Sequence, residues 1–216
     1  MSDLNLLYTE VSHMHDHLCP RQVLGVRMGV RAGTELGIDL PQADKRLIAL
    51  VETDGCTADG IGVATGCWVG RRTMFIVDYG KVAVTFVDGE SGRSIRILPH
   101  PAARSNTIDY APRIQDPWQR QLVAYQVMPD DELLAVQQVR LTLDFSALIS
   151  EPAKRSICYS CAEEINNGRE VMLDGRTLCR YCAGEAYFVP LDSPGQAALP
   201  PAIGPGLPSL VAEGRL

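Results

Sequence analysis

The first long hydrophobic pattern in the chain is helical and covers residues 20–31. Val23, Val26 and Val30 fall on one face at this spacing, and Pro20 suits the first turn of a helix. Cys19 would then lie at the helix N-terminus, where the helix dipole and the free N–H groups favour a thiolate. The pattern therefore predicts an amphipathic helix that begins beside a cysteine.

Three glycines of the predicted helix, Gly25, Gly29 and Gly33, recur every four residues. Glycines at this spacing form a ridge without side chains, so we expect another helix or strand to pack closely against it. Residues 57–66 are also rich in small side chains and predict a short helix, with Asp59 as its cap.

Strand-length patterns occupy residues 46–53, 73–77, 82–86, 93–98 and 139–143. The first is a continuous apolar run, which predicts a central strand buried on both faces. The second and third flank a glycine-containing turn and predict a hairpin, whereas the last two alternate. Short helices are expected to start at Asp116-Pro117 and at Pro129, and residues 102–115 look irregular. These elements predict an α+β core over residues 1–150, with a mixed or antiparallel sheet flanked by helices.

Two Cys-x-x-Cys pairs follow the core. Cys158 and Cys161 are separated by seventeen residues from Cys179 and Cys182, which is the spacing of a four-cysteine zinc site. Four thiolates at about 2.3 Å from Zn²⁺ complete a tetrahedral shell without an open position, so this zinc would be structural. The alternative is two disulfides or four unrelated thiols, which nothing in the chain favours because no feature suggests secretion.

The residues around these cysteines, 154–190, predict a small zinc finger. Residues 170–178 have the pattern of a hairpin that turns at Asp174-Gly175, and the second cysteine pair would start a helix that ends near Phe188. This arrangement suggests a treble-clef or ribbon-like finger, which depends on its metal for about 10–16 kcal/mol of apparent folding free energy. Residues 191–216 are rich in Pro and Gly and predict a flexible tail.

The composition narrows the class of protein. The 216 residues carry a formal charge of −6 and a pI of about 5.2, which argues against a general nucleic-acid binder. The N-terminus lacks the basic segment and apolar run of a signal peptide, and no stretch approaches the roughly 20 apolar residues of a membrane span. Seven cysteines, an odd number, fit a reducing compartment better than a disulfide framework. We therefore expect a cytoplasmic protein that does not enter the membrane.

A second set of metal-capable residues lies in the core: His15, His17, Cys19, Cys56 and Cys67. Mixtures of histidine and cysteine suit zinc or another borderline-soft metal, and a site with an open position would be reactive. The alternative is that the cysteines are small buried apolar residues and the histidines are ordinary surface residues. On spacing alone, this second interpretation is favoured.

These residues are part of a longer series of motifs. His15-Asp16-His17-Leu18-Cys19-Pro20 is followed by Glu52-x-Asp54-x-Cys56-x-x-Asp59, then by Gly66-Cys67, then by Asp78-Tyr79-Gly80-Lys81. In order and spacing, over residues 13–145, the series resembles that of the FmdE family, whose name denotes a component of formylmethanofuran dehydrogenase. The cysteine finger resembles an appendage that some members of that family carry.

The resemblance implies an α+β core, a tightly intertwined homodimer and a metal-binding cleft built from the His17/Cys19 and Cys56/Cys67 segments. It also implies that the finger serves regulation, metal sensing or contact with protein or RNA. The family name comes from association with a molybdenum or tungsten enzyme, and kinship of fold does not fix function.

The chain departs from the family pattern at four positions. Family members usually have glycine where this chain has Asp16 and Arg21, and often have glutamine and threonine near Gly62 and Trp68. Because glutamine and threonine could contact a ligand, the ligand or the reaction can differ in this protein.

Three functions fit these observations. The first is a metal-binding accessory or regulatory protein, with structural zinc in the finger, a second metal or ligand in the core, and a protein partner on the finger. The second is an enzyme related to formylmethanofuran dehydrogenase chemistry, in which Cys19, Cys56 or their metal reacts and His17, Asp54 or Asp59 carries protons. The third is a nucleic-acid-binding regulator, which the balance of five basic and five acidic residues in the finger does not favour.

Overall fold

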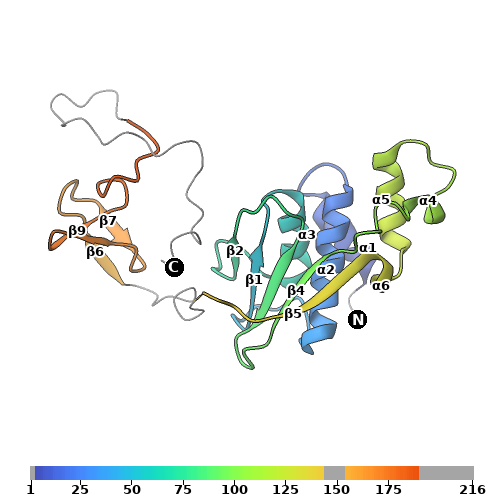
Figure 1. Ribbon diagram of the computed structural model, residues 1–216, viewed down its shortest axis with the longest axis horizontal. Coiled ribbons are helices and arrows are strands. Elements are labelled where there is room, and N and C mark those ends of the chain that lie inside the picture. The colour runs from blue at the N-terminus through green and yellow to red at the C-terminus, as the bar shows by residue number, and fades with distance from the viewer. Residues whose placement is uncertain (1–2, 144–153, 190–216) are drawn as a thin grey trace. The chain divides into compact units, whose positions relative to one another are not determined.

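The computed structural model describes residues 3–143 and 154–189 (Figure 1). The chain divides into two compact units, residues 1–142 and residues 143–216, and each is described by itself. The predicted tail over 191–216 and most of the linker before the finger lie outside the described residues. In the part of the chain that is described, no helix has the length and apolar content to cross a membrane.

The first unit is built on a five-stranded sheet in the order β2-β1-β3-β4-β5. Its strands are β1 (Leu47–Val51), β2 (Met74–Ile76), β3 (Val84–Asp88), β4 (Ser94–Pro99) and β5 (Leu134–Val139). β2 is parallel to β1 and every other neighbouring pair is antiparallel, so the sheet is mixed. All five residues of β1 are buried, which confirms the predicted buried strand.

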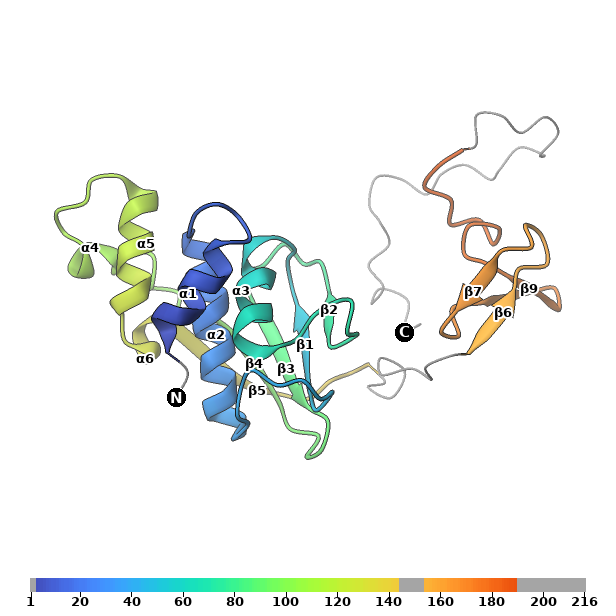
Figure 2. The same ribbon diagram turned by 180° about the vertical axis from the view of Figure 1, so that it is seen from behind.

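Helices complete this unit. They are α1 (Leu4–Ser12), α2 (Pro20–Leu36), α3 (Cys56–Thr65), α4 (Thr107–Tyr110), α5 (Pro117–Val127) and α6 (Asp130–Leu133). Figures 1 and 2 show α2 and α3 side by side against one face of the sheet. Val23 and Val26 of α2 are fully buried there in one cluster with Leu47, Ala49 and Val51 of β1. The predicted α+β architecture, a mixed sheet flanked by helices, is confirmed.

The glycine ridge of α2 packs against α3, as the spacing predicts. A Cβ atom at Gly25 would lie 3.0 Å from the Cα of Gly60, and one at Gly29 would lie 2.6 Å from the Cβ of Ala64. Since both series of contacts advance in the same direction, α2 and α3 run parallel. Their N-termini therefore lie at the same end of the unit, and that end holds the candidate core site.

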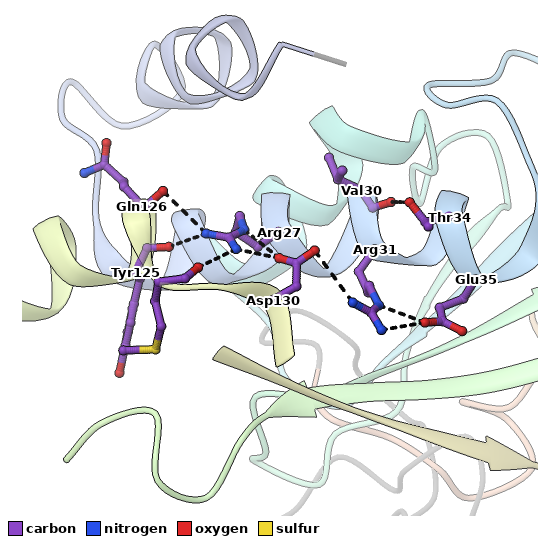
Figure 3. Close-up of polar contacts among 9 residues, drawn as sticks. Arg27, Val30, Arg31, Thr34, Glu35, Tyr125, Gln126 and Asp130 are labelled. Carbon is purple, nitrogen blue, oxygen red and sulfur yellow. Dashed lines mark hydrogen bonds and ion pairs between the residues drawn. The ribbon is translucent and has the colours of Figure 1, made fainter. Parts of the chain in front are cut away.

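A buried arginine joins α2 to the C-terminal end of α5 (Figure 3). Arg27 donates hydrogen bonds to the carbonyl oxygens of Tyr125 at 2.8 Å, Gln126 at 3.4 Å and Met128 at 2.7 Å. Its guanidinium also donates to one carboxylate oxygen of Asp130, at 3.1 and 2.5 Å. The last carbonyls of a helix have no partner inside it, so Arg27 supplies their missing donors from another element.

Two strand predictions were wrong. Residues 73–77 and 82–86 do not form a hairpin, because β2 and β3 pair with opposite edges of β1. The connection passes around the end of β1, where the N–H groups of Tyr79 and Lys81 donate to the carbonyl oxygen of Glu52. The last strand covers residues 134–139 rather than 139–143, because β5 pairs antiparallel with β4 from Leu134, opposite Pro99, to Val139, opposite Ser94, where β4 begins.

The helix predictions need smaller corrections. No helix was predicted at α1, which buries Leu7, Tyr8 and Val11. The short helix α4 lies in a stretch that was expected to be irregular. Asp59 does not cap α3. The cap position is Gly55, with φ 80°, and it makes no side-chain cap hydrogen bond.

The finger unit contains two short antiparallel hairpins. β6 (Arg155–Ile157) pairs with β7 (Glu164–Asn166), and β8 (Val171–Leu173) pairs with β9 (Arg176–Leu178). The second confirms the hairpin predicted over residues 170–178. The helix predicted after Cys179 is absent from the described residues of this unit, because the single turn there ends at Gly184, whose φ is 105°. The two hairpins without a helix correspond to the ribbon-like form.

Candidate functional site

The finger brings its four cysteines together. The sulfur atoms of Cys158, Cys161, Cys179 and Cys182 all lie within 4.8 Å of one another, and those of Cys161 and Cys179 are 3.9 Å apart. Sulfurs bound to one tetrahedral Zn²⁺ at about 2.3 Å would be separated by roughly 3.8 Å, so this spacing fits the ion. The turns after β6 and β9 supply one pair of cysteines each.

The polar surroundings of these thiols favour a thiolate at one position. Burial opposes ionisation of Cys158, but hydrogen bonds from the backbone N–H groups of Cys161 and Cys179 outweigh it and lower the pKa of Cys158 to about 6. Burial instead raises the pKa of Cys182 to about 12. Of these two thiols, Cys158 therefore ionises first, and a bound cation would have to displace the proton of Cys182.

The core holds a contiguous group of four candidate residues at the N-termini of α2 and α3. One ring nitrogen of His15, Nε2, lies 2.7 Å from the carboxylate of Asp59. Asp59 follows Cys56 by three positions on α3 and so lies on the same side of the helix. Burial raises the pKa of the Cys56 thiol, and so does its hydrogen-bonding contact with the thiol of Cys19. The group thus runs from His15 through Asp59 and Cys56 to Cys19.

Cys19 has a structural role besides its place in this group. It is the N-cap of α2, and its sulfur accepts a hydrogen bond from the backbone N–H of Gln22 at 3.4 Å. In return, the side-chain oxygen of Gln22 accepts from the backbone N–H of Cys19 at 2.8 Å, and its amide nitrogen donates to the carbonyl of Val11 in α1. Our sequence interpretation missed Gln22, although Cys-x-x-Gln before an apolar run resembles a capping box.

The structure does not bring the other predicted core residues into this group. The ring of His17 lies 6.2 Å from that of Trp118. Cys67 is buried beyond the opposite end of α3, and its sulfur donates to the carbonyl oxygen of Leu47. Ten helical residues separate the two ends of α3, which is about 15 Å. Cys67 therefore belongs to the core packing, and burial raises the pKa of its thiol.

The core group is less compact than the finger. Among residues 3–143 and 154–189, the finger cysteines alone place three or more metal-capable atoms within 4.8 Å of one another. A metal in the core would therefore need side-chain rotation or further ligands from outside this group. This difference separates a preformed site in the finger from a partly assembled one in the core.

The other motif residues shape the end of β1. Glu52 is buried there and receives two hydrogen bonds from Arg96 of β4, at 2.5 and 2.7 Å. Asp54 is exposed, and the ammonium of Lys81 lies 5.9 Å from the centre of the Tyr79 ring. Glu52 thus stabilises the sheet by binding Arg96, whereas Asp54 and Lys81 lie at the surface.

Two of the departures from the family pattern contact each other. The ring of Trp68 packs against the backbone of Gly62, and a Cβ atom at Gly62 would lie 2.6 Å from that ring. The indole therefore occupies the space that a side chain at position 62 would need. The two departures form one change in packing.

These features define a class of protein: an α+β core with a thiol-containing group at the N-termini of two parallel helices, followed by a separate four-cysteine unit. The model of the family described as "FmdE, Molybdenum formylmethanofuran dehydrogenase operon" matches residues 14–135, which is more than half of the chain. The chain belongs to the FmdE family, which confirms the resemblance that the motifs indicated.

Two known proteins resemble the chain over most of its length. A protein of Archaeoglobus fulgidus named a probable S-adenosyl-L-methionine-binding protein is 28% identical over 210 residues, which cover 87% of this chain and 55% of that protein. The chain thus spans about half the length of this relative. A crystal structure of a tungsten formylmethanofuran dehydrogenase FmdE-like protein from Syntrophus aciditrophicus has a TM-score of 0.59 at 17% identity. The match covers 87% of this chain and 96% of that one, and it supports the fold.

Proposed function

We propose that this protein is a metal-binding accessory or regulatory protein whose finger holds a structural Zn²⁺. The observation that carries the proposal is the convergence of four cysteine sulfurs within 4.8 Å of one another. Four thiolate ligands saturate tetrahedral zinc, so this ion would stabilise the finger rather than catalyse a reaction. Among residues 154–189, three buried residues form the apolar core of the finger: Cys158, Ile165 and Leu178. A core this small makes a metal the main source of the finger's stability.

The core group is the proposed second metal or ligand site, built from His15, Cys19, Cys56 and Asp59. Imidazole, thiolate and carboxylate are all ligands that zinc accepts. The same group supports the enzyme hypothesis less well. Because burial and the contact with Cys19 raise the pKa of Cys56, its thiol is largely protonated near neutral pH and is a weak nucleophile without a metal.

The partner and compartment belong to the same proposal. By family resemblance the core would form a homodimer, and its reduced cysteines suit the cytoplasm. Exposed aromatic side chains on the finger, among them Tyr159 and Tyr187, fit contact with a protein partner. Nucleic acid is less favoured, because the finger pairs Arg155 with Glu164 and Arg180 with Glu185, which leaves little unbalanced positive charge.

The test is the metal content per chain, measured by elemental analysis on the reduced full-length protein. We expect two metal ions in the wild type, one in Cys19→Ser and one in Cys161→Ser. Cys67→Ser is the matched control, since it removes a core thiol outside the group, and it should retain two. One ion in both the wild type and Cys19→Ser would remove the core site from the proposal, and an unchanged content in Cys161→Ser would remove the finger site.

A further inference from the structure

Cys19 and Cys56 are a pair of adjacent thiols, although 37 positions separate them in the sequence. Cys19 is the N-cap of α2, Cys56 is the first residue of α3, and their side chains are in hydrogen-bonding contact. Each cysteine stands at the N-terminal end of its helix, and the close packing of α2 on α3 through Gly25 and Gly60 brings these two ends together, as a disulfide requires. Cys56 is half-buried and Cys19 is 7% exposed, so a small oxidant would reach Cys56 first.

The surroundings hold this pair in place. The parallel helices that carry it are pressed together through Gly25 and Gly60, which leave no room for a side chain between the two backbones. Gln22 fixes the start of α2 by bonding the backbone of Cys19 and the carbonyl of Val11. Neither element can easily withdraw its cysteine from the other.

We propose that Cys19 and Cys56 form a redox-modification site, at which a peroxide converts the two thiols into a disulfide. The thiolate of Cys56, a minor species near neutral pH that forms again as it is consumed, attacks one oxygen of hydrogen peroxide. The O–O bond breaks, and the departing oxygen takes up the proton that the thiol released, which gives a sulfenic acid and one water. The sulfur of Cys19 then attacks the sulfenic sulfur, the S–O bond breaks, and a second water leaves. Two thiols lose two hydrogens and two electrons, and one peroxide is reduced to two waters.

The modification would control the proposed core site. It consumes both sulfur ligands and leaves only His15 and Asp59 of the group, which is too few to retain a metal. This consequence rests on the proposed function, whereas the disulfide itself does not. Reduction by dithiothreitol should return both thiols and with them the capacity to bind metal.

The test is a peptide map of the full-length protein after treatment with hydrogen peroxide, alkylation of free thiols and digestion by trypsin without reductant. Trypsin releases Cys19 in residues 1–21, and releases Cys56 together with Cys67 in residues 47–71. We expect these two peptides to be linked in the wild type and in Cys67→Ser, and to separate on addition of dithiothreitol. The link should be absent from Cys56→Ser.

Two results would overturn the redox site. One is a wild-type map without the link, and the other is a link that persists in Cys56→Ser, which would make Cys67 the partner. Elemental analysis of the same samples tests the consequence, with an expected fall from two metal ions to one on oxidation. If the link forms while the reduced protein holds a single ion, the redox site stands and the proposed core metal site fails.

Discussion

The substitution Arg27→Met should destabilise the core unit strongly. Arg27 is a buried guanidinium, with a side chain 8% exposed, and it serves three carbonyl oxygens at the end of α5 as well as the carboxylate of Asp130. Methionine fills much of the same space but donates no hydrogen bond. The carbonyls would lose their donors inside the protein, while Asp130, with 36% of its side chain exposed, would be partly rehydrated.

The magnitude follows from the number and burial of these bonds. A hydrogen bond that involves a charged group contributes about 1.5–3 kcal/mol net, and removal of one partner from a buried ion pair costs about 3–5 kcal/mol. The costs of the separate hydrogen bonds do not simply add, because water partly replaces the lost donors. We therefore expect Arg27→Met to lower the free energy of unfolding by about 3–5 kcal/mol. This is a large part of the roughly 5–15 kcal/mol that stabilises a typical domain.

Urea unfolding followed by tryptophan fluorescence would measure this loss. Both tryptophans, Trp68 and Trp118, lie in the core unit, so the signal does not report on the finger. With a slope of about 2 kcal/mol per molar urea, the midpoint should fall by roughly 2 M. Arg31→Ala is the control one turn later on α2, where loss of the pair with Glu35 and of the longer pair with Asp130, at 3.9 Å, should cost only about 0.3–1 kcal/mol. Equal midpoints for the two variants would refute the reasoning.

Three other predictions concern packing, pH and metal. Gly62→Ala should lower core stability by about 1–3 kcal/mol, because its Cβ would meet the Trp68 ring, and calorimetry should show that the same substitution costs much less in a Trp68→Ala background. A hydrogen bond from Arg46 holds the pKa of Asp88 well below its usual range. The ionised carboxylate therefore stabilises the folded state at a pH above its unfolded pKa of about 4, and this stabilisation is lost as the pH falls through the folded pKa. Wild-type stability should therefore fall more steeply than that of Asp88→Asn between about pH 5 and about pH 2, and parallel curves would contradict this. Removal of metal by a chelator should unfold the finger, and so should Cys161→Ser. Both should abolish amide exchange protection over residues 154–189 while the core stays folded.

The local patterns of the chain predicted many of its elements. The helix from Pro20 and the capping position of Cys19 follow from a fixed proline and an apolar face, and both depend on neighbouring residues alone. The buried strand β1 follows from an uninterrupted apolar run. The hairpin prediction over residues 73–86 was wrong although the turn is present. β2 and β3 do not pair with each other, because each of them pairs with one edge of β1.

The candidate sites also differ in how far local sequence patterns predicted them. The four finger cysteines could be grouped from spacing, because each pair lies in one short turn and a local hairpin joins the pairs. Asp59 was predicted as a helix cap, yet its carboxylate bonds His15, 44 positions away, because the contact depends on how α1 leads into α2. No local signal encodes that distance.

By itself, the sequence determined the α+β class, the family, the start of α2 and the four-cysteine finger, because short-range sterics, apolar periodicity and ligand spacing act within one segment. Tertiary structure alone decided that Cys19 meets Cys56 and that Cys67 does not join them. The physical reason is the close parallel packing of α2 on α3 through Gly25 and Gly60, which brings two helix N-termini together and places Cys67 beyond the far end of α3.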